Sequence, residues 1–265
     1  MSYRIGVLQF EPKFLEMERN RKRMEDLLSP VEADLIVLPE LATSGYLFQN
    51  REQVIRVAED AQTGSTAALF RKLAKAKSAS YVIGFAEKDK GKFYNSAMLV
   101  NPDGKIFVYR KTHLFFEEKK WFEPGNSGLN VFEAKNGVRV GMMICFDWIF
   151  PESARTLALR GAQILSHSAN LVLPWCQQAM ITRSLENRVF SITSNRIGTE
   201  KNDGNELTFT GMSQILSTKG EILTRCETSG ECVKIVEINP EEADNKLITE
   251  FNHAFLDRRP EMYER

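Results

Sequence analysis

Hydrophobic residues recur along the chain with two periods, one typical of strands and one typical of helices. Runs rich in apolar and β-branched residues predict strands at residues 3–10, 35–38, 81–86, 96–100, 106–109, 138–144, 164–168 and 191–194. Apolar residues spaced three and four positions apart predict helices at residues 16–28, 65–77, 152–160 and 177–189. Gly161 is a candidate C-cap for the third helix. Turn sequences between apolar runs predict hairpins at residues 88–92, 101–105 and 217–221.

The order of these segments predicts a mixed α/β architecture. Strands near both ends of the chain, with helices and hairpins between them, fit two mixed sheets packed face to face and covered by helices on their outer sides. We therefore expect a four-layer α-β-β-α sandwich. No Pro-, Gly- or Ser-rich tract and no block of like charge divides the sequence, so we expect one domain spanning residues 1–265.

Charge and hydropathy exclude several classes of partner. The chain has 35 basic and 35 acidic residues, so nothing in its net charge favours a nucleic acid or an anionic membrane surface. No apolar run approaches the roughly 20 residues that a membrane span needs. Residues 1–13 alternate like a strand and lack the pattern of a signal peptide. We expect a cytoplasmic protein.

The cysteines and histidines are few and scattered. Cys145, Cys176, Cys226 and Cys232 form no C-x-x-C pair, and in a reducing compartment this spacing argues against a disulfide framework and against a zinc site. The chain has only 3 histidines, which leaves little material for a metal cluster. We therefore expect no bound metal, and each cysteine is either a small buried side chain or a nucleophile.

One of these thiols stands at a position suited to chemistry. In "RVGMMICFDWIFPE" (139–152) Cys145 ends a nearly continuous apolar run, and Pro151 suits the first turn of a following helix. Cys145 thus lies at a strand-to-helix elbow, where α/β proteins bind ligands and where backbone N–H groups can bind an anion. The alternative is a small core residue at the end of a strand.

Charged residues follow two other predicted strands. Glu40 comes directly after the strand at 35–38 and Pro39, and Lys111 follows the strand at 106–109. Each could be a solvated loop residue. Together with Cys145, however, they supply a base, a cation for an oxyanion and a nucleophile, the parts needed for thiol hydrolysis without histidine.

The three stretches that contain Glu40, Lys111 and Cys145 resemble the motifs of a known protein family. "LPELATSGY", "YRKTHLF" and "MICFDWIFPE" resemble the three signature motifs of the nitrilase superfamily of carbon–nitrogen hydrolases. The resemblance runs over nearly the whole chain and is closest to a short, single-domain archaeal and bacterial nitrilase/amidase branch. It implies the α-β-β-α fold, a homodimer or higher homo-oligomer, and no cofactor.

The resemblance also implies roles for individual residues. Glu40 matches the general base, Lys111 the lysine and Cys145 the nucleophile, while Glu118 matches the second glutamate, and the adjacent Glu117 is the alternative for that last role. The implied reaction converts a small amide or nitrile into a carboxylic acid and ammonia through a Cys thioester. The same residues would serve an N-carbamoyl amine, so that substrate class stays open.

Several further residues are candidates for contact with the substrate. The backbone N–H of Phe146 is placed to stabilise an oxyanion together with Lys111, and we expect the Cys145 thiol to rest between its neutral and charged forms. Tyr46 and Trp148 lie in the motif loops, where aromatic side chains either line the substrate or pack in the core. Asn170 follows a strand and either contacts substrate or caps its loop.

Two other readings compete with this one. A Cys-His hydrolase would pair Cys145 with His167 or His253, although neither histidine stands in a motif of that class. A binding or scaffold protein would keep the fold and lack the chemistry.

Overall fold

Two six-stranded sheets lie face to face in the computed structural model, which describes residues 1–263. The first sheet has the order β14-β1-β2-β3-β4-β5, with bounds Cys232–Ile238, Tyr3–Gln9, Leu35–Val37, Ser80–Asp89, Lys92–Val100 and Ile106–Arg110. The second has the order β13-β12-β9-β8-β7-β6, with bounds Ile222–Arg225, Gln214–Leu216, Phe190–Asn195, Ile164–Ala169, Arg139–Ile144 and Val131–Glu133. Both sheets are mixed, because each joins parallel neighbours (β1-β2-β3 and β7-β8-β9) to antiparallel ones.

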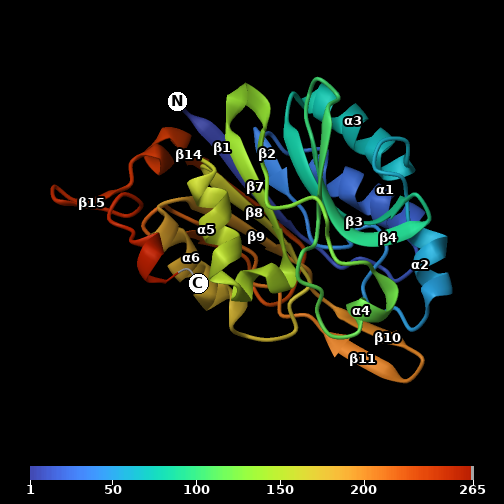
Figure 1. Cartoon of the computed structure of the whole chain (residues 1–265). Helices are drawn as coiled ribbons and strands as arrows, with labels where there is room; N and C mark the ends of the chain where they lie inside the picture. Colours follow the sequence, from blue (N-terminus) through green and yellow to red (C-terminus); the bar gives the residue numbers. More distant parts are fainter. Residues whose placement is uncertain (264–265) are drawn as a thin grey trace.

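Helices cover the two outer faces (Figure 1). Helices α1 (Met17–Leu28) and α3 (Ser65–Lys77) lie on the first sheet, and α5 (Pro151–Leu159) and α6 (Cys176–Asn187) lie on the second. The predicted four-layer α-β-β-α sandwich is confirmed. The eight predicted strands and four predicted helices are all present, with ends that differ by a few residues.

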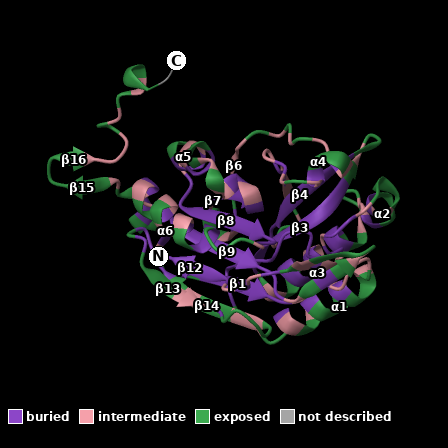
Figure 2. Ribbon diagram, turned by 90° about the horizontal axis from the view of Figure 1, so that it is seen from below, coloured by how far each residue is buried: buried purple, intermediate pink, exposed green. Residues whose placement is uncertain are grey.

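Strand β7 illustrates why a continuous apolar run is needed in the middle of this arrangement. Val140, Met142 and Ile144 face the core between the sheets, while Met143 belongs to the cluster beneath α5. Because successive side chains of a strand point to opposite faces, a strand covered on both sides must be apolar throughout. Most of the sheet interior is buried in this way (Figure 2).

The ends of α5 follow from its sequence. Pro151 occupies the first turn, as predicted, and the helix ends at a cap residue, Arg160. Gly161 is therefore one position beyond the cap, with φ +89°, a conformation that glycine adopts without strain.

The elements that the sequence analysis did not predict are short or peripheral. They are α2 (Arg51–Val57), α4 (Glu118–Trp121), β6, β10 (Thr199–Asn202), β11 (Asn205–Thr208), β14, β15 (Leu247–Thr249), β16 (Asn252–His253) and the 3-10 turns at Lys135–Gly137, Cys145–Ile149, Pro240–Asp244 and Pro260–Met262. Strands β12 and β13 form the hairpin predicted at residues 217–221. The β10-β11 hairpin projects at the same end of the molecule as α4 (Figure 1). The β15-β16 hairpin stands away from the body and is largely exposed (Figure 2).

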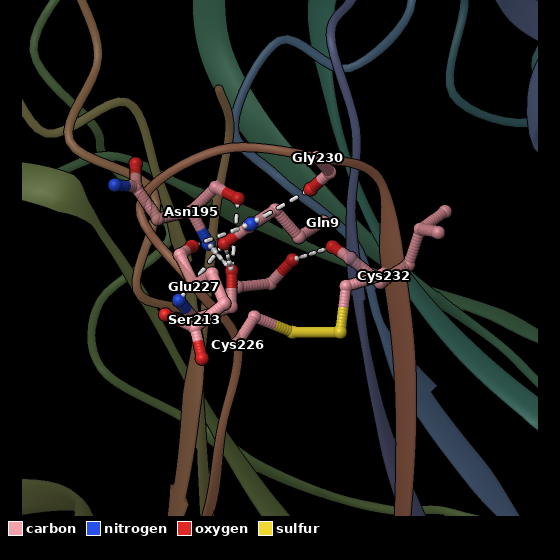
Figure 3. Close-up of a disulfide and its surroundings, with 9 residues drawn as sticks. Gln9, Asn195, Ser213, Cys226, Glu227, Gly230 and Cys232 are labelled. Atoms are coloured by element: carbon pink, nitrogen blue, oxygen red, sulfur yellow. Dashed lines mark hydrogen bonds between the residues drawn. A yellow bond between two sulfur atoms is a disulfide. The ribbon is translucent and has the colours of Figure 1, made fainter.

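The expectation that no cysteines pair was wrong. Cys226 and Cys232 form a disulfide, with Cα atoms 6.3 Å apart (Figure 3). The reason is topological: the chain leaves β13 at the edge of one sheet and enters β14 at the edge of the other through a short loop that closes on itself. The side-chain amide of Gln9 holds this loop by donating to the carbonyl oxygens of Glu227 and Gly230, at 2.9 and 3.0 Å. Cys145 and Cys176 are the free thiols.

Within residues 1–263, no helix combines the length and apolar character that crossing a membrane requires.

Candidate active site

The ends of several strands meet at one edge of the sandwich. Strands β1, β2 and β3 are parallel, and two antiparallel steps through β4 return β5 to the same direction. The segments after β2 and β5 therefore lie at the same edge and carry Glu40 and Lys111. In the second sheet, β7 and β8 are parallel and lead to Cys145 and Asn170. The topology thus brings together four residues that are far apart in the sequence.

Lys111 joins two buried carboxylates. Its Nζ lies 2.7 Å from Oε1 of Glu40 and 2.7 Å from Oε1 of Glu118. Oε1 of Glu40 also accepts a 2.7 Å hydrogen bond from the side-chain amide of Asn95, whereas its Oε2 is buried without a partner among the described residues. All three charged side chains are buried. A lysine ammonium has three N–H donors, so one remains for another acceptor.

Burial sets the proton affinities of these groups. Burial raises the pKa of Glu40 to about 7, with Lys111 opposing the shift and Glu118 adding to it. Burial alone would lower the pKa of Lys111, but Glu118 and Glu40 outweigh that effect and raise it above its usual range. The cluster therefore holds a permanent ammonium beside a carboxylate that exchanges its proton near neutral pH.

Two glycines allow the backbone to approach closely enough to build this cluster. A Cβ on Gly84 of β3 would lie 2.5 Å from Cα of Glu40, and a Cβ on Gly125 would lie 2.1 Å from the carbonyl oxygen of Arg110. Gly125 also donates its N–H to the carbonyl oxygen of Lys111 at 2.9 Å. Side chains at either glycine would push the segments carrying Glu40 or Lys111 out of place.

Cys145 begins the 3-10 turn that follows β7, with the left-handed φ of +40°. Non-glycine residues adopt this conformation only when their surroundings impose it. Here the buried carboxylate of Asp147 does so: Oδ2 accepts the N–H of Ile144 at 2.9 Å and the Tyr109 hydroxyl at 2.7 Å, and Oδ1 lies 2.8 Å from Nδ1 of His113. Asp147 therefore ties the turn with the thiol to the segment that carries the lysine.

Burial favours the protonated form of the thiol, which differs from the expectation that Cys145 rests between its two forms. Burial raises the pKa of Cys145 well above its usual value, and Glu40 raises it further, while Lys111 opposes the shift. Sγ lies 3.9 Å from the carbonyl oxygen of Asn170. A proton acceptor is therefore needed when the sulfur attacks, and Glu40 is near enough to perturb the pKa of the thiol.

The histidines do not form a Cys-His pair with this thiol. His167 Nε2 lies 2.9 Å from the backbone carbonyl oxygen of Cys145, and burial lowers the pKa of His167 to about 4. The ring is therefore neutral and donates to the carbonyl oxygen instead of accepting from Sγ. His253 lies in the β15-β16 hairpin, outside the lining of the cavity that contains Cys145.

The structure separates the two adjacent glutamates. Glu118 is buried against Lys111, and its Oε2 also accepts the N–H of Phe115 at 3.2 Å. Glu117 is half-buried and pairs with Lys120. Only Glu118 can therefore act on the cluster directly.

Two small hollows flank the cluster, with cavity volumes of about 120 and 80 Å³. The first is lined by Tyr46, Phe115, Glu118 and Trp121 and by residues 205–207 of strand β11. The second is lined by Cys145, Phe146, Trp148, Asn170 and Trp175, and it shares Phe115 and Val172 with the first. Both are mostly apolar, with polar groups at the reacting end.

The predicted contact residues occupy different positions around these hollows. The Tyr46 hydroxyl donates to Oε1 of Glu118 at 2.8 Å. Phe146 is the second residue of the 3-10 turn, where backbone N–H groups have no acceptor within the turn. Trp148 lines the second hollow. The side-chain amide of Asn170 is buried there, and neither its oxygen nor its nitrogen has a partner among the described residues.

Sequence reasoning missed three residues that hold the cluster. Asn95, in the run "FYNSAM", donates to Glu40, and an amide directly before the predicted strand at 96–100 was a signal that could have found it. Asp147 stands two positions after Cys145 in the motif quoted above. Glu200, whose carboxylate accepts the backbone N–H of Tyr46 at 2.9 Å, lies in a hairpin that the periodicity did not reveal. No group of three or more His, Cys, Asp or Glu within residues 1–263 is arranged to hold a metal ion.

Known proteins share both the sequence and the fold. The sequence profile of the family described as Carbon-nitrogen hydrolase matches residues 4–245. A protein of Pyrococcus abyssi named "Nitrilase" is 43% identical, and the match covers 98% of each chain. An N-carbamoylputrescine amidase of Arabidopsis thaliana is 30% identical over 87% of this chain and 83% of its own. The crystal structure of a carbon-nitrogen hydrolase from Helicobacter pylori G27 superposes with a TM-score of 0.82 at 27% identity and covers 92% of each chain.

Proposed function

The chain belongs to the carbon–nitrogen hydrolase family, and we propose that Cys145, Glu40, Lys111 and Glu118 carry out its hydrolysis of a small amide or nitrile. The observation that carries this assignment is the buried cluster in which Lys111 bonds both carboxylates beside a free, buried thiol. Burying three charged groups is costly unless they are paired and hydrogen-bonded. A purely structural role would be served as well by apolar residues of similar volume.

In the first half-reaction, Sγ of Cys145 attacks the carbonyl carbon of an amide. Glu40 takes the thiol proton as the S–C bond forms, and its pKa of about 7 suits it to give that proton up again. The developing oxyanion is stabilised by the third N–H of Lys111 and by the backbone N–H of Phe146. One such donor typically contributes about 10²–10³ in rate. Glu40 then protonates the nitrogen, the C–N bond breaks, and ammonia leaves a thioester on Cys145.

In the second half-reaction, water attacks the thioester carbon. Glu40 removes the water proton, and Glu118 orients the water while keeping the Lys111 ammonium in place. The C–S bond then breaks, the sulfur recovers its proton from Glu40, and the carboxylic acid departs. A nitrile would form a thioimidate first, whose hydrolysis by the same groups releases ammonia.

The apolar walls of the two hollows favour a small, largely apolar acyl group. Tyr46 and Trp148 border the space that such a group would fill. Asn170 offers an unpartnered amide beside the thiol, which suits a polar group next to the scissile bond. This feature favours an N-carbamoyl amine as the second candidate, because the extra N–H of its ureido group needs an acceptor.

Ammonia release from a matched panel of amides, nitriles and N-carbamoyl amines tests the proposal. We expect Cys145→Ala to abolish release and to leave the unfolding temperature nearly unchanged, because a strand-end thiol contributes little volume to the core. Cys176→Ala is the matched control, since Cys176 is the other free, buried cysteine, and it should retain turnover. Hydrolysis by Cys145→Ala, or loss of hydrolysis only in Cys176→Ala, would contradict the assignment.

We also propose that residues 1–265 work as one domain in a homodimer or higher homo-oligomer. The shared core, which contains residues of both sheets, supports one domain. Exposed apolar side chains at and near α5 and α6, among them Ile149, Leu159 and Leu185, support self-association.

We also propose that the protein is located in the cytoplasm. The two free thiols support a cytoplasmic location. The Cys226–Cys232 disulfide argues against it, because disulfides are rare in reducing compartments. Alkylation of the protein in intact cells, followed by mass analysis, would reveal whether these two cysteines are reduced there.

A further inference from the structure

A second buried ion pair lies at the base of the β10-β11 hairpin. The carboxylate of Glu200, on β10, pairs with the guanidinium of Arg196, and both side chains are buried. Arg196 also donates to the carbonyl oxygen of Pro12 at 3.0 Å, and its guanidinium lies 4.0 Å from the centre of the Phe209 ring. The guanidinium thus has partners on several sides.

The carboxylate of Glu200 serves a neighbouring segment as well as its ion pair. Its Oε2 accepts the backbone N–H groups of Tyr46 and Leu47, at 2.9 and 2.8 Å. The preceding Gly45 has φ +78°, and a Cβ there would lie 2.5 Å from Oε1 of Glu200. The segment is therefore shaped to receive a carboxylate, and Glu200 determines where the backbone of Tyr46 lies.

Tyr46 continues this connection into the catalytic cluster. Its hydroxyl donates to Oε1 of Glu118 at 2.8 Å, and the same oxygen accepts from Lys111 at 2.7 Å. An edge-to-face contact with Phe209, with ring centres 6.1 Å apart, limits the positions that the tyrosine ring can take. A shift of the Tyr46 backbone would therefore weaken or misdirect the bond to Glu118.

We propose that Glu200, held by Arg196, is a positioning residue that acts through Tyr46 on Glu118. This inference rests on the proposed role of Glu118 in thioester hydrolysis. Glu200 does not touch the substrate or the reacting atoms. Its effect falls mainly on release of the acid, because that step uses the orientation of Glu118 directly, whereas attack by Cys145 depends on Glu118 only through Lys111.

A simpler role would be to staple the hairpin to the body, and other bonds already share that task. The side-chain amide of Asn202 donates to the carbonyl oxygen of Leu47 at 2.8 Å, and that of Asn205 donates to the side chain of Gln49 at 3.0 Å. A staple alone would change stability and substrate binding. It would not single out the second half-reaction.

A double-mutant cycle separates the two roles. The variants are Glu200→Gln, Tyr46→Phe and the pair together, and the readouts are the rate of acid release, thioester accumulation by intact mass, and the unfolding temperature. Each single variant should slow acid release by about tenfold, the usual effect of losing one hydrogen bond to a charged group. Because both act through one bond, the double variant should be no slower than the slower single variant.

Two further variants protect the interpretation. Glu200→Gln leaves Arg196 buried without its counter-ion, so Glu200→Asp is included in case the first variant does not fold: it keeps the charge but withdraws it from the Tyr46 N–H. Lys201→Gln is the matched control, because Lys201 is the next residue on the same strand and is exposed. It should leave all readouts unchanged.

The outcomes discriminate clearly. The inference would be overturned if the rate effects of Glu200→Gln and Tyr46→Phe multiplied in the double variant, or if the Glu200 variants changed only the unfolding temperature. The proposed function would stand in either case. If Glu118→Gln itself leaves acid release unaffected, the assigned role of Glu118 fails, and the inference fails with it.

Discussion

Replacing Glu40 by Gln should remove activity and should also remove a pH dependence of stability, so that the variant gains stability relative to the wild type as the pH rises. Burial raises the folded-state pKa of Glu40 to about 7 from an ordinary value of 4.5. Below pH 4.5 the carboxyl is protonated in both the folded and unfolded states. Between pH 4.5 and 7 only the folded state keeps the proton, so the free energy of unfolding falls as pH rises through this window. Above about pH 7 both states are ionised and the dependence ends.

The magnitude follows from the difference in pKa. A difference of about 2.5 corresponds to about 3 kcal/mol of stability lost by the wild type across the window. Glutamine does not titrate, so Glu40→Gln escapes this loss. For a chain of this length, 3 kcal/mol corresponds to about 5 °C in unfolding temperature. The variant should therefore gain about that much, relative to the wild type, between pH 4.5 and pH 8.

Calorimetry or circular dichroism at several pH values measures the effect. Glu117→Gln is the matched control, because Glu117 is the adjacent glutamate paired with Lys120 at the surface, and its difference from the wild type should vary little with pH. The reasoning would be refuted if the difference in unfolding temperature between Glu40→Gln and the wild type did not change with pH. It would also be refuted if that difference moved in favour of the wild type above pH 5. Glu40 would then be an ordinary carboxylate, unsuited to exchanging protons near neutrality.

Four further outcomes are expected. The pre-steady-state rate of thioester formation should rise with pH through about 7, since Glu40 must lose its proton to act as the base, and a rate that falls across that range would exclude it. Glu40→Gln should form no thioester with an amide, whereas Glu118→Gln should accumulate one; intact-mass spectrometry giving the opposite pattern would exchange their roles. Reducing the Cys226–Cys232 disulfide should cost about 2 kcal/mol of stability, seen as a lower unfolding temperature with dithiothreitol, and ammonia release should persist. Sedimentation should detect a dimer or larger assembly, and a monomer at micromolar concentration would rule out the proposed assembly.

The sequence by itself determined the layers of the fold and the positions of the main reactive groups. The continuous apolar run before Cys145 predicted a strand covered on both faces, and Glu40 and Lys111 were placed directly after two predicted strands, which became β2 and β5. These conclusions depend on local periodicity and on the rule that parallel strands place their carboxyl ends together. Both are readable from residues adjacent in the chain.

Tertiary structure alone decided which groups bond and how they titrate. Glu118 rather than Glu117 meets Lys111, Glu200 reaches the Tyr46 segment from 154 residues away, and Cys226 meets Cys232 because two sheet edges adjoin. The protonated thiol is favoured because burial and Glu40 raise the pKa of Cys145 more than Lys111 lowers it. Each outcome depends on distances of a few ångströms and on exclusion of water. The contact of Glu200 with the Tyr46 segment joins parts of the chain remote in sequence, and the short loops between Lys111 and Glu118 and between Cys226 and Cys232 take their shape from the elements packed around them, so the local pattern did not reveal these contacts.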